Sequence, residues 1–247
     1  MRIDVLTLFP EMISAPLKCS LLGRACDSGL LDLHVHNIRD FAPDKHHVVD
    51  DLPYGGGAGM VMMVEPLYKA IKAIDPENKA RKILTDASGQ AFNQTTAKTL
   101  MLEPWLLLVC GHYKGVDERI KKLFDFSELS VGDYVLTGGE FPALVIIDAV
   151  ARLLPGVIKE IDSAQSDSYF NGLLGYPEYT RPGDFQGLAV PEILTGGNHE
   201  QIRKWRLRQS LKRTLARRPD LLVNRPLDDE EKMLLSLEDK DVEDDRK

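Results

Sequence analysis

Residues 131–142, with the sequence VGDYVLTGGEFP, decide the fold class of this chain. The segment predicts a short apolar strand over 131–137, a turn at Gly138 and Gly139, and a helix that begins at Glu140. A strand that runs through glycine directly into a helix is typical of α/β domains with a parallel sheet, whose ligands bind at the carboxyl ends of the strands. Glycines at such a turn let backbone groups reach a flat heterocycle, so we expect either a nucleoside site or an ordinary turn here.

The same alternation of strands and helices fills the first 155 residues. We predict strands over residues 3–9, 31–37, 82–85, 106–110 and 131–137, and helices over 11–25, 65–74, 94–102, 116–124 and 140–154. The predicted strands are almost continuously apolar, which indicates a mainly parallel sheet that is covered on both faces.

Two more glycine-rich segments come earlier in the chain. Residues 110–115 (CGHYKG) follow an apolar strand and open a helix, which is the position of a second ligand loop. Residues 54–60 (YGGGAGM) lack the Lys-Ser or Lys-Thr pair of a P-loop and the spacing of a dinucleotide fingerprint. This loop is therefore either a close-packed turn or a place where the backbone approaches a large ligand.

The chain changes character after residue 156. Residues 160–172 are polar and small, and they predict a flexible linker. A long helix follows over residues 198–218 with Asn198 as its N-cap, and a second helix is predicted over 229–237. We therefore predict a first domain over 1–159, the linker over 160–172 and a small helical domain over 173–247.

Charge is distributed unevenly along the chain. The net charge is −7, but ten acids and four bases lie between Asp228 and Lys247, whereas residues 201–219 contain eight bases and no acid. On a helix, Arg203, Arg206, Arg213 and Arg217 would form one stripe, and Leu207, Leu211 and Leu215 would form the next. The sequence predicts a helix that packs on its leucine face and offers arginines to RNA phosphates, or else a solvated basic face.

The cysteines, the first residues and the longest apolar runs indicate the cellular location of the protein. The cysteines Cys19, Cys26 and Cys110 are odd in number and lack the spacing of a zinc site, so we expect reduced, buried thiols. The first residues predict a strand rather than a signal peptide, and no apolar run is long enough to cross a bilayer. These features favour a cytoplasmic protein with no membrane partner.

Several segments together resemble one family. The pattern VGDYVLTGGE, with CGHYKGVDER and YGGGAGM before it and ARLLPGV, SDSY, EYTRP and TGGNHEQIRKWRLRQSLKRTLARRPDLL after it, is similar to the bacterial tRNA (guanine-N1)-methyltransferases. The similarity covers nearly the whole chain. It implies the SPOUT class, with a mainly parallel α/β sheet, a deep C-terminal trefoil knot and a small helical C-terminal domain that binds tRNA. It also implies a homodimer with shared active sites.

The resemblance further implies the reaction, which is transfer of a methyl group from S-adenosylmethionine to N1 of guanosine 37, the nucleoside 3′ of the anticodon. Asp167 would be the general base that removes the N1 proton, and Arg152 would stabilise the charge that develops at O6. The arginine stripe would bind the tRNA. The residues carried over for the cofactor are Gly111, Tyr113, Val131, Gly132, Asp133, Tyr134, Val135, Leu136, Gly138 and Gly139.

The chain departs from the family's usual pattern at three places. Lys114 stands where relatives usually have a glutamate that is linked to magnesium dependence, residues 85–89 (TDASG) replace a Leu-Ser-Pro-Gln-Gly type segment, and Gly175 replaces an aspartate. Magnesium is therefore left open as a second cofactor. Two other functions also stay open: a SPOUT enzyme that methylates ribosomal RNA, and a noncatalytic RNA-binding factor.

Overall fold

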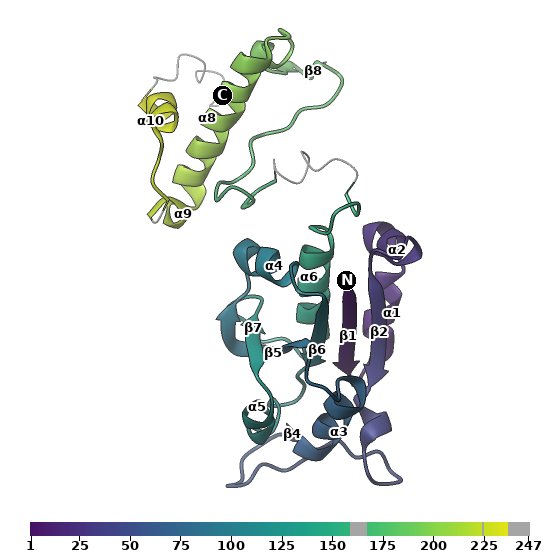
Figure 1. Cartoon of the computed structure of the whole chain (residues 1–247). Helices are drawn as coiled ribbons and strands as arrows, with labels where there is room; N and C mark the ends of the chain where they lie inside the picture. Colours follow the sequence, from purple (N-terminus) through teal and green to yellow (C-terminus); the bar gives the residue numbers. More distant parts are fainter. Residues whose placement is uncertain (159–166, 224, 237–247) are drawn as a thin grey trace. The chain divides into compact units, whose positions relative to one another are not determined.

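The chain forms two compact units, Met1–Lys159 and Glu160–Lys247, each with a hydrophobic core of its own (Figure 1). The computed structural model describes residues 1–158, 167–223 and 225–236. Most of the predicted linker, over 160–166, and the end of the last predicted helix at residue 237 lie outside these residues.

A five-stranded sheet forms the centre of the N-terminal unit, in the order β2-β1-β6-β5-β7. Its strands are β1 (Arg2–Thr7), β2 (Asp32–Asn37), β5 (Arg81–Ala91), β6 (Trp105–Cys110) and β7 (Phe126–Ser130). Every neighbouring pair in this sheet is parallel, so the predicted parallel α/β architecture is confirmed. A separate antiparallel pair is formed by β3 (Asp50–Asp51) and β4 (Val61–Met62).

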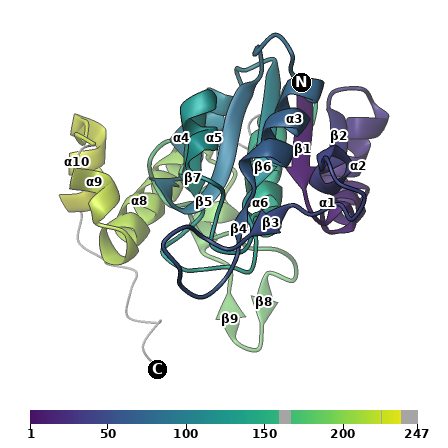
Figure 2. The same cartoon turned by 90° about the horizontal axis from the view of Figure 1, so that it is seen from below.

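Helices cover both faces of the sheet, and Figure 2 shows α3 and α6 on opposite sides of its strands. One face carries α1 (Pro10–Leu17), α2 (Ser20–Asp27), α4 (Gln94–Leu100) and α6 (Glu140–Ala151); the other carries the 3-10 helix η1 (Ile38–Phe41), α3 (Val64–Ile74) and α5 (Arg119–Leu123). Successive strand residues point to opposite faces, so Leu106 and Leu108 enter one core whereas Leu107 enters the other. This two-sided burial explains the continuously apolar strands.

The strand predicted over residues 131–137 is wrong. The last strand of the sheet is β7, which ends at Ser130, and residues 131–139 form a loop beyond its carboxyl end. A strand needs a neighbour for its backbone hydrogen bonds, and the pairing of β7 with β5 ends where Ser130 meets Ala91. Val131 at the start of the loop still packs against the core, whereas Val135 further along it is 88% exposed.

The single helix predicted over residues 11–25 is also wrong. The chain forms α1 and α2 with a break at Lys18 and Cys19, and Cys19 is extended. Pro16 has no N–H with which to continue the hydrogen-bond ladder of α1. Gly23 then packs directly on the Lys18 carbonyl, where a side chain would clash.

The helix predicted over residues 116–124 is shortened to α5. The residues before α5 pair with β4 instead, because the Met62 N–H donates to the Gly115 carbonyl and the Asp117 N–H donates to the Met62 carbonyl. The other predicted helices of this unit are confirmed apart from their ends.

The described part of the C-terminal unit contains three helices, a short hairpin and a 3-10 helix. These elements are β8 (Asp184–Phe185), β9 (Leu188–Ala189), η2 (Glu192–Leu194), α8 (His199–Arg217), α9 (Asp220–Val223) and α10 (Asp229–Ser236). Asn198 caps α8 as predicted, since its side chain accepts a 3.2 Å hydrogen bond from the Gln201 N–H. Leu173, Leu211 and Leu234 form the core of this unit. None of the helices in the described part of the chain combines the length and hydropathy that a membrane span requires.

Candidate active site

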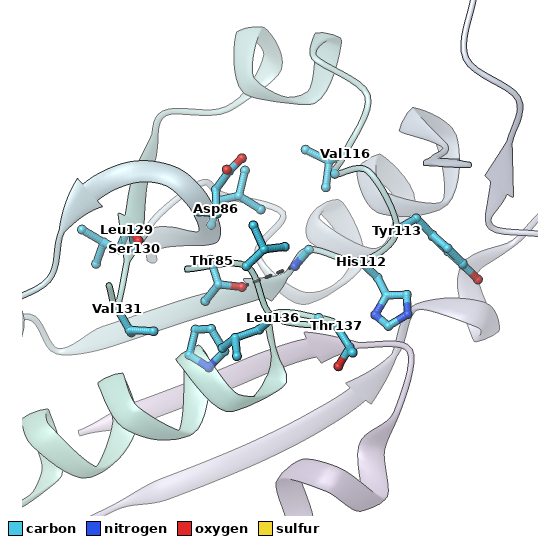
Figure 3. Close-up of a pocket in the computed structure, with 18 of the residues that line it drawn as sticks. Thr85, Asp86, His112, Tyr113, Val116, Leu129, Ser130, Val131, Leu136 and Thr137 are labelled. Atoms are coloured by element: carbon cyan, nitrogen blue, oxygen red, sulfur yellow. Dashed lines mark hydrogen bonds between the residues drawn. The ribbon is translucent and has the colours of Figure 1, made fainter. Parts of the chain in front are cut away.

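A pocket of about 460 Å³ lies at the carboxyl-terminal side of β5, β6 and β7 (Figure 3). Its lining consists of residues 84–87, 111–116, 129–132 and 134–139, together with Pro142. The carboxyl ends of neighbouring parallel strands meet at one edge of a sheet, which is where α/β proteins bind ligands. The pocket therefore lies where the strand order predicts a ligand.

Backbone contacts hold the segments around this pocket together at their glycines. The Gly139 N–H donates to the Gly111 carbonyl at 2.7 Å. The Gly111 N–H donates to the Thr85 hydroxyl at 3.4 Å, and Figure 3 draws this bond as a dashed line at Thr85. A Cβ on Gly139 would lie 2.7 Å from the Gly111 nitrogen and 2.8 Å from the Cys110 Cα. Glycine is required at 139 because two backbone segments approach each other there.

The pocket brings together nine of the ten residues predicted to bind the cofactor. The tenth, Asp133, is exposed and is not part of the lining. The structure adds residues that the sequence interpretation missed, among them Thr85, Asp86 and Ser130. The signal that could have found them is positional, because Thr85 is the last residue of β5 that pairs with β6, Asp86 follows it, and Ser130 ends β7.

A buried carboxylate lies beside the pocket at the start of α6. Glu140 is 1% exposed and accepts a 2.7 Å hydrogen bond from the Thr7 hydroxyl of β1. The other Glu140 oxygen and His112 Nδ1 both crowd the space next to the Gly138 Cα, so a side chain at 138 would clash with them. His112 Nδ1 is buried and has no hydrogen-bond partner among the described residues. These contacts connect β1, the 111–116 loop and α6.

The cysteines are free thiols. Burial raises the pKa of the Cys110 thiol well above its usual value, and the charge of Glu140 raises this pKa further. A thiol in this state is protonated at neutral pH and is no nucleophile. The expectation of buried thiols is wrong for Cys19, which is exposed because it stands at the break between α1 and α2.

Asp167 and Arg152 belong to different units. Asp167 is exposed, and it lines a cavity of about 730 Å³ in the C-terminal unit together with Tyr176 and Arg206. Arg152 is partly exposed and forms the C-cap of α6 in the N-terminal unit. Their assignment as a catalytic pair therefore stays a prediction.

Two of the four predicted RNA-binding arginines are engaged inside the C-terminal unit. Arg203 forms ion pairs with Glu200 at 2.8 Å and with Glu230 at 2.5 Å. Arg213 donates a 2.8 Å hydrogen bond to the Gly175 carbonyl. By contrast, Arg217 is exposed, and the Arg206 guanidinium lies 4.8 Å from the centre of the Tyr176 ring. The sequence pattern therefore overstated how much of the stripe is available for RNA.

The predicted leucine face of α8 is only partly right. Leu211 is buried and Leu207 packs against the core, but Leu215 is 54% exposed. The buried neighbour is Thr214, whose hydroxyl accepts a hydrogen bond from the Leu174 N–H and donates one to the Ser210 carbonyl. A hydroxyl with both partners satisfied can replace an apolar side chain in a core.

The sheet and the pocket define a class of protein: parallel α/β proteins whose ligand pocket is formed by backbone-rich loops at the carboxyl ends of the strands. The model of the tRNA (guanine-1)-methyltransferase TrmD family matches residues 1–224. The chain belongs to this family.

Relatives in the same family support this assignment over more than nine tenths of the chain. The chain is 52% identical over 240 residues to the tRNA (guanine-N(1)-)-methyltransferase of Limosilactobacillus fermentum, covering 95% of each chain. It is 55% identical over 225 residues to the protein of that name from Geotalea uraniireducens, covering 91% of each. With the relative from Desulforamulus reducens the identity is 53% over 238 residues, covering 95% of this chain and 94% of that one.

Proposed function

We propose that this chain transfers a methyl group from S-adenosylmethionine to N1 of guanosine 37 in tRNA. Relatives that share about half of its residues carry the name tRNA (guanine-N(1)-)-methyltransferase, which supports methyl transfer to a tRNA guanine. The observation that carries the proposal is the pocket of glycine-bearing loops at the carboxyl side of the sheet. Such a pocket suits a nucleoside-containing methyl donor.

The residues of the pocket fit S-adenosylmethionine, which supplies an electrophilic methyl group on a sulfonium when bound. Backbone groups of the loops that contain Gly111 and Gly138 would bind its adenine edge, because no side chain intervenes there. Apolar side chains such as Val131 and Leu136 line the same pocket and would cover the faces of the ring. The other proposed contacts are Tyr113, Gly132, Tyr134, Val135 and Gly139; Asp133 would contribute only from outside the lining.

Gly139→Ala is expected to weaken binding of S-adenosylmethionine about tenfold or more. The new methyl group would push the 139 backbone away from Gly111, and overpacking of this kind costs about 1–3 kcal/mol. Isothermal titration calorimetry measures the change in Kd. Gly183→Ala is the matched control, since a Cβ at Gly183 would meet nothing within 4 Å. An unchanged affinity in Gly139→Ala would show that the close contact between Gly139 and Gly111 is not needed for ligand binding.

Asp167 and Arg152 would carry out the proton chemistry. N1 of guanine bears a proton, so its lone pair cannot attack a methyl group until a base removes that proton. The Asp167 carboxylate is exposed and would accept this proton as the general base. Negative charge then develops at O6, where the Arg152 guanidinium would donate hydrogen bonds.

The C-terminal unit would bind the tRNA, with residues 160–172 as a linker to the N-terminal methyl-donor domain. Arg206 and Arg217 are the arginines of the predicted stripe best placed for phosphate contacts. Arg203 and Arg213 would have to exchange their internal partners to reach RNA, so their expected contributions are smaller. An arginine over a tyrosine ring, as at Tyr176, is also a suitable platform for an unstacked base.

A homodimer with shared active sites is part of the proposal. The exposed side of α6 carries Phe141 and Val145, which are 54% and 49% exposed, and the neighbouring loop carries Val135. These exposed apolar side chains on α6 and on a loop of the pocket lining support a second copy as their cover. We also propose that these loops form the trefoil knot of the SPOUT class, which the close contact of Gly139 with Gly111 supports. A cytoplasmic location is part of the same proposal.

The residues present do not fit a protein-bound magnesium ion. Magnesium prefers several oxygen ligands, and the described residues contain no group of three or more His, Cys, Asp or Glu side chains suited to a metal. The pocket itself offers one carboxylate, Asp86, and places the cation of Lys114 in the same lining. We therefore assign no step to magnesium.

The proposed reaction is tested by incubating the purified protein with labelled S-adenosylmethionine and tRNA transcripts that carry a guanosine at position 37. We expect label at N1 of that guanosine, and none in transcripts with adenosine there. Label in ribosomal RNA alone would favour the second methyltransferase function. Tight RNA binding without label in any RNA would favour the noncatalytic factor.

A further inference from the structure

The pocket contains two opposite charges, one from β5 and one from the loop after β6. Among the described residues that line it, Asp86 and Lys114 carry the full charges, and His112 is the remaining titratable base. Figure 3 shows Asp86 on β5 and Tyr113, the neighbour of Lys114, on a separate segment of the chain. A ligand in this pocket therefore meets both an anion and a cation.

The stem of Lys114 is held in place by the glycine-rich loop at residues 54–60. The Cγ, Cδ and Cε atoms of Lys114 would lie 3.1–3.2 Å from a Cβ on Gly59, so the stem covers the bare backbone of that residue. The Lys114 N–H also donates to the Met60 carbonyl at 3.0 Å. Within the described residues, no carboxylate forms an ion pair with the Lys114 ammonium group. Its charge is available to a ligand.

The Asp86 carboxylate is fixed in its ionised form. Oδ1 accepts hydrogen bonds from the Ser88 N–H at 2.9 Å and the Ser88 hydroxyl at 2.8 Å. Burial alone would raise the pKa of Asp86, but these hydrogen bonds and the charge of Lys121 outweigh it and hold the pKa below its usual value.

Asp86 is not neutralised by Lys121. The Lys121 ammonium lies 3.5 Å from Asp86 Oδ2, but it is closer to Glu128, at 2.8 Å, and also to Glu118, at 3.3 Å. One ammonium group thus serves three carboxylates, and negative charge remains at Asp86 for a cationic partner.

We propose that Lys114 and Asp86 bind the two charged ends of an α-amino acid carried by the pocket ligand. Lys114 would pair with its carboxylate and Asp86 with its ammonium group, so the methyl donor is held by its amino-acid end without a metal ion. The proposal rests on the proposed function, because S-adenosylmethionine joins such an amino acid to a nucleoside. It also gives the glycine-rich loop a role, since Gly59 leaves room for the lysine stem.

Two product-like ligands separate the contacts of the amino-acid end from those of the nucleoside. S-adenosylhomocysteine has both parts, whereas 5′-methylthioadenosine lacks the amino acid. Calorimetry with EDTA present measures the affinity for S-adenosylhomocysteine. Lys114→Met and Asp86→Asn are each expected to lower this affinity about tenfold or more, which is the usual effect of losing a hydrogen bond to a charged group. The affinity for methylthioadenosine should stay unchanged in both variants, which also shows that the pocket is folded.

Analogues with one charge removed assign each contact. Decarboxylated S-adenosylhomocysteine should be insensitive to Lys114→Met but sensitive to Asp86→Asn, and the deaminated analogue should show the reverse. Lys122→Met, which removes an exposed lysine outside the pocket lining, is the control and should behave as the unmodified protein.

The outcomes distinguish this proposal from the proposed function. Equal affinities for S-adenosylhomocysteine in the unmodified protein and both variants would overturn the amino-acid contacts and leave the methyl-donor pocket intact. A requirement for magnesium in the calorimetry would also overturn them. Failure of the unmodified protein to bind either ligand would instead refute the proposed function.

Discussion

Asp167→Ala is expected to lower the rate of methyl transfer about 10²- to 10⁴-fold while leaving the affinity for S-adenosylmethionine unchanged. The size of the effect is that of general-base catalysis, because the N1 proton must leave before N1 can attack. The affinity should not change, since Asp167 belongs to the C-terminal unit and lines none of the pocket at the sheet. Single-turnover kinetics with a labelled methyl group and excess enzyme measure the chemical step apart from product release.

The pH dependence of the same reaction gives a second measure of the role of Asp167. A missing base should leave a rate that rises with pH, because hydroxide then has to remove the proton. Asp125→Ala is the control, since this aspartate is 93% exposed and lies outside both cavities. An Asp167→Ala enzyme within a few-fold of the unmodified rate would remove Asp167 from the mechanism and leave the pocket assignment standing.

Lys82→Met is expected to cause the largest loss of stability, about 3–5 kcal/mol in the free energy of unfolding of the N-terminal unit. Lys82 and Asp75 form a 2.6 Å ion pair with side chains 2% and 1% exposed. Removing the lysine leaves the Asp75 carboxylate buried without its counter-ion. Asp75 still accepts N–H groups from Lys79 and Ala80, so the fold is weakened rather than abolished.

Urea denaturation measures this loss of stability. A Trp205→Phe background leaves Trp105, on β6, as the fluorescent reporter of the N-terminal unit. Lys79→Met is the control, because its ion pair with Glu77 is exposed and such pairs contribute about 0–1 kcal/mol. Adding Asp75→Asn to Lys82→Met should recover part of the loss. Equal stabilities of the two lysine variants would contradict the importance of the buried pair.

The buried pair of Lys82 and Asp75 also predicts how the free energy of unfolding depends on pH. Burial alone would raise the pKa of Asp75, but Lys82 and the N–H groups of Lys79 and Ala80 hold the folded-state pKa below its usual value. A folded pKa below the unfolded one gives stability that is present above the unfolded pKa and is lost as pH falls through the folded pKa. The difference between the unmodified protein and Lys82→Met should therefore narrow below about pH 4.

Local sequence predicted the elements whose apolar residues are all buried in the cores. The apolar run of β6 is an example, since alternate side chains enter the two cores of the N-terminal unit. The N-cap Asn198 was equally predictable, because capping depends on residues within one turn. Residues 131–137 failed for the opposite reason. Of their apolar side chains only Val131 packs against the core, while Val135 and Leu136 line the pocket, and an apolar run by itself does not distinguish a buried strand from a pocket loop.

The residues of the site also fall into those that the sequence indicated and those that it did not. The glycines at 111, 138 and 139 indicated a ligand loop, because close backbone approach leaves a mark on composition. Thr85 and Asp86 lie in a segment that departs from the family's usual pattern, and the residue types alone did not indicate that they line the pocket. The arginines of α8 looked alike in sequence, yet Arg203 is neutralised by Glu230 from a different helix.

The sequence by itself determined the class of this protein: hydrophobic patterning and turn glycines act through neighbours in the chain, and they were sufficient for a parallel α/β sheet with a ligand at the carboxyl ends of its strands. Only the tertiary structure decided which charges the ligand meets. Asp86 and Lys114 are far apart in the chain, and they line one pocket because parallel strand order brings β5 beside β6. Charge pairing depends on distance in space, so residue types alone could not predict it.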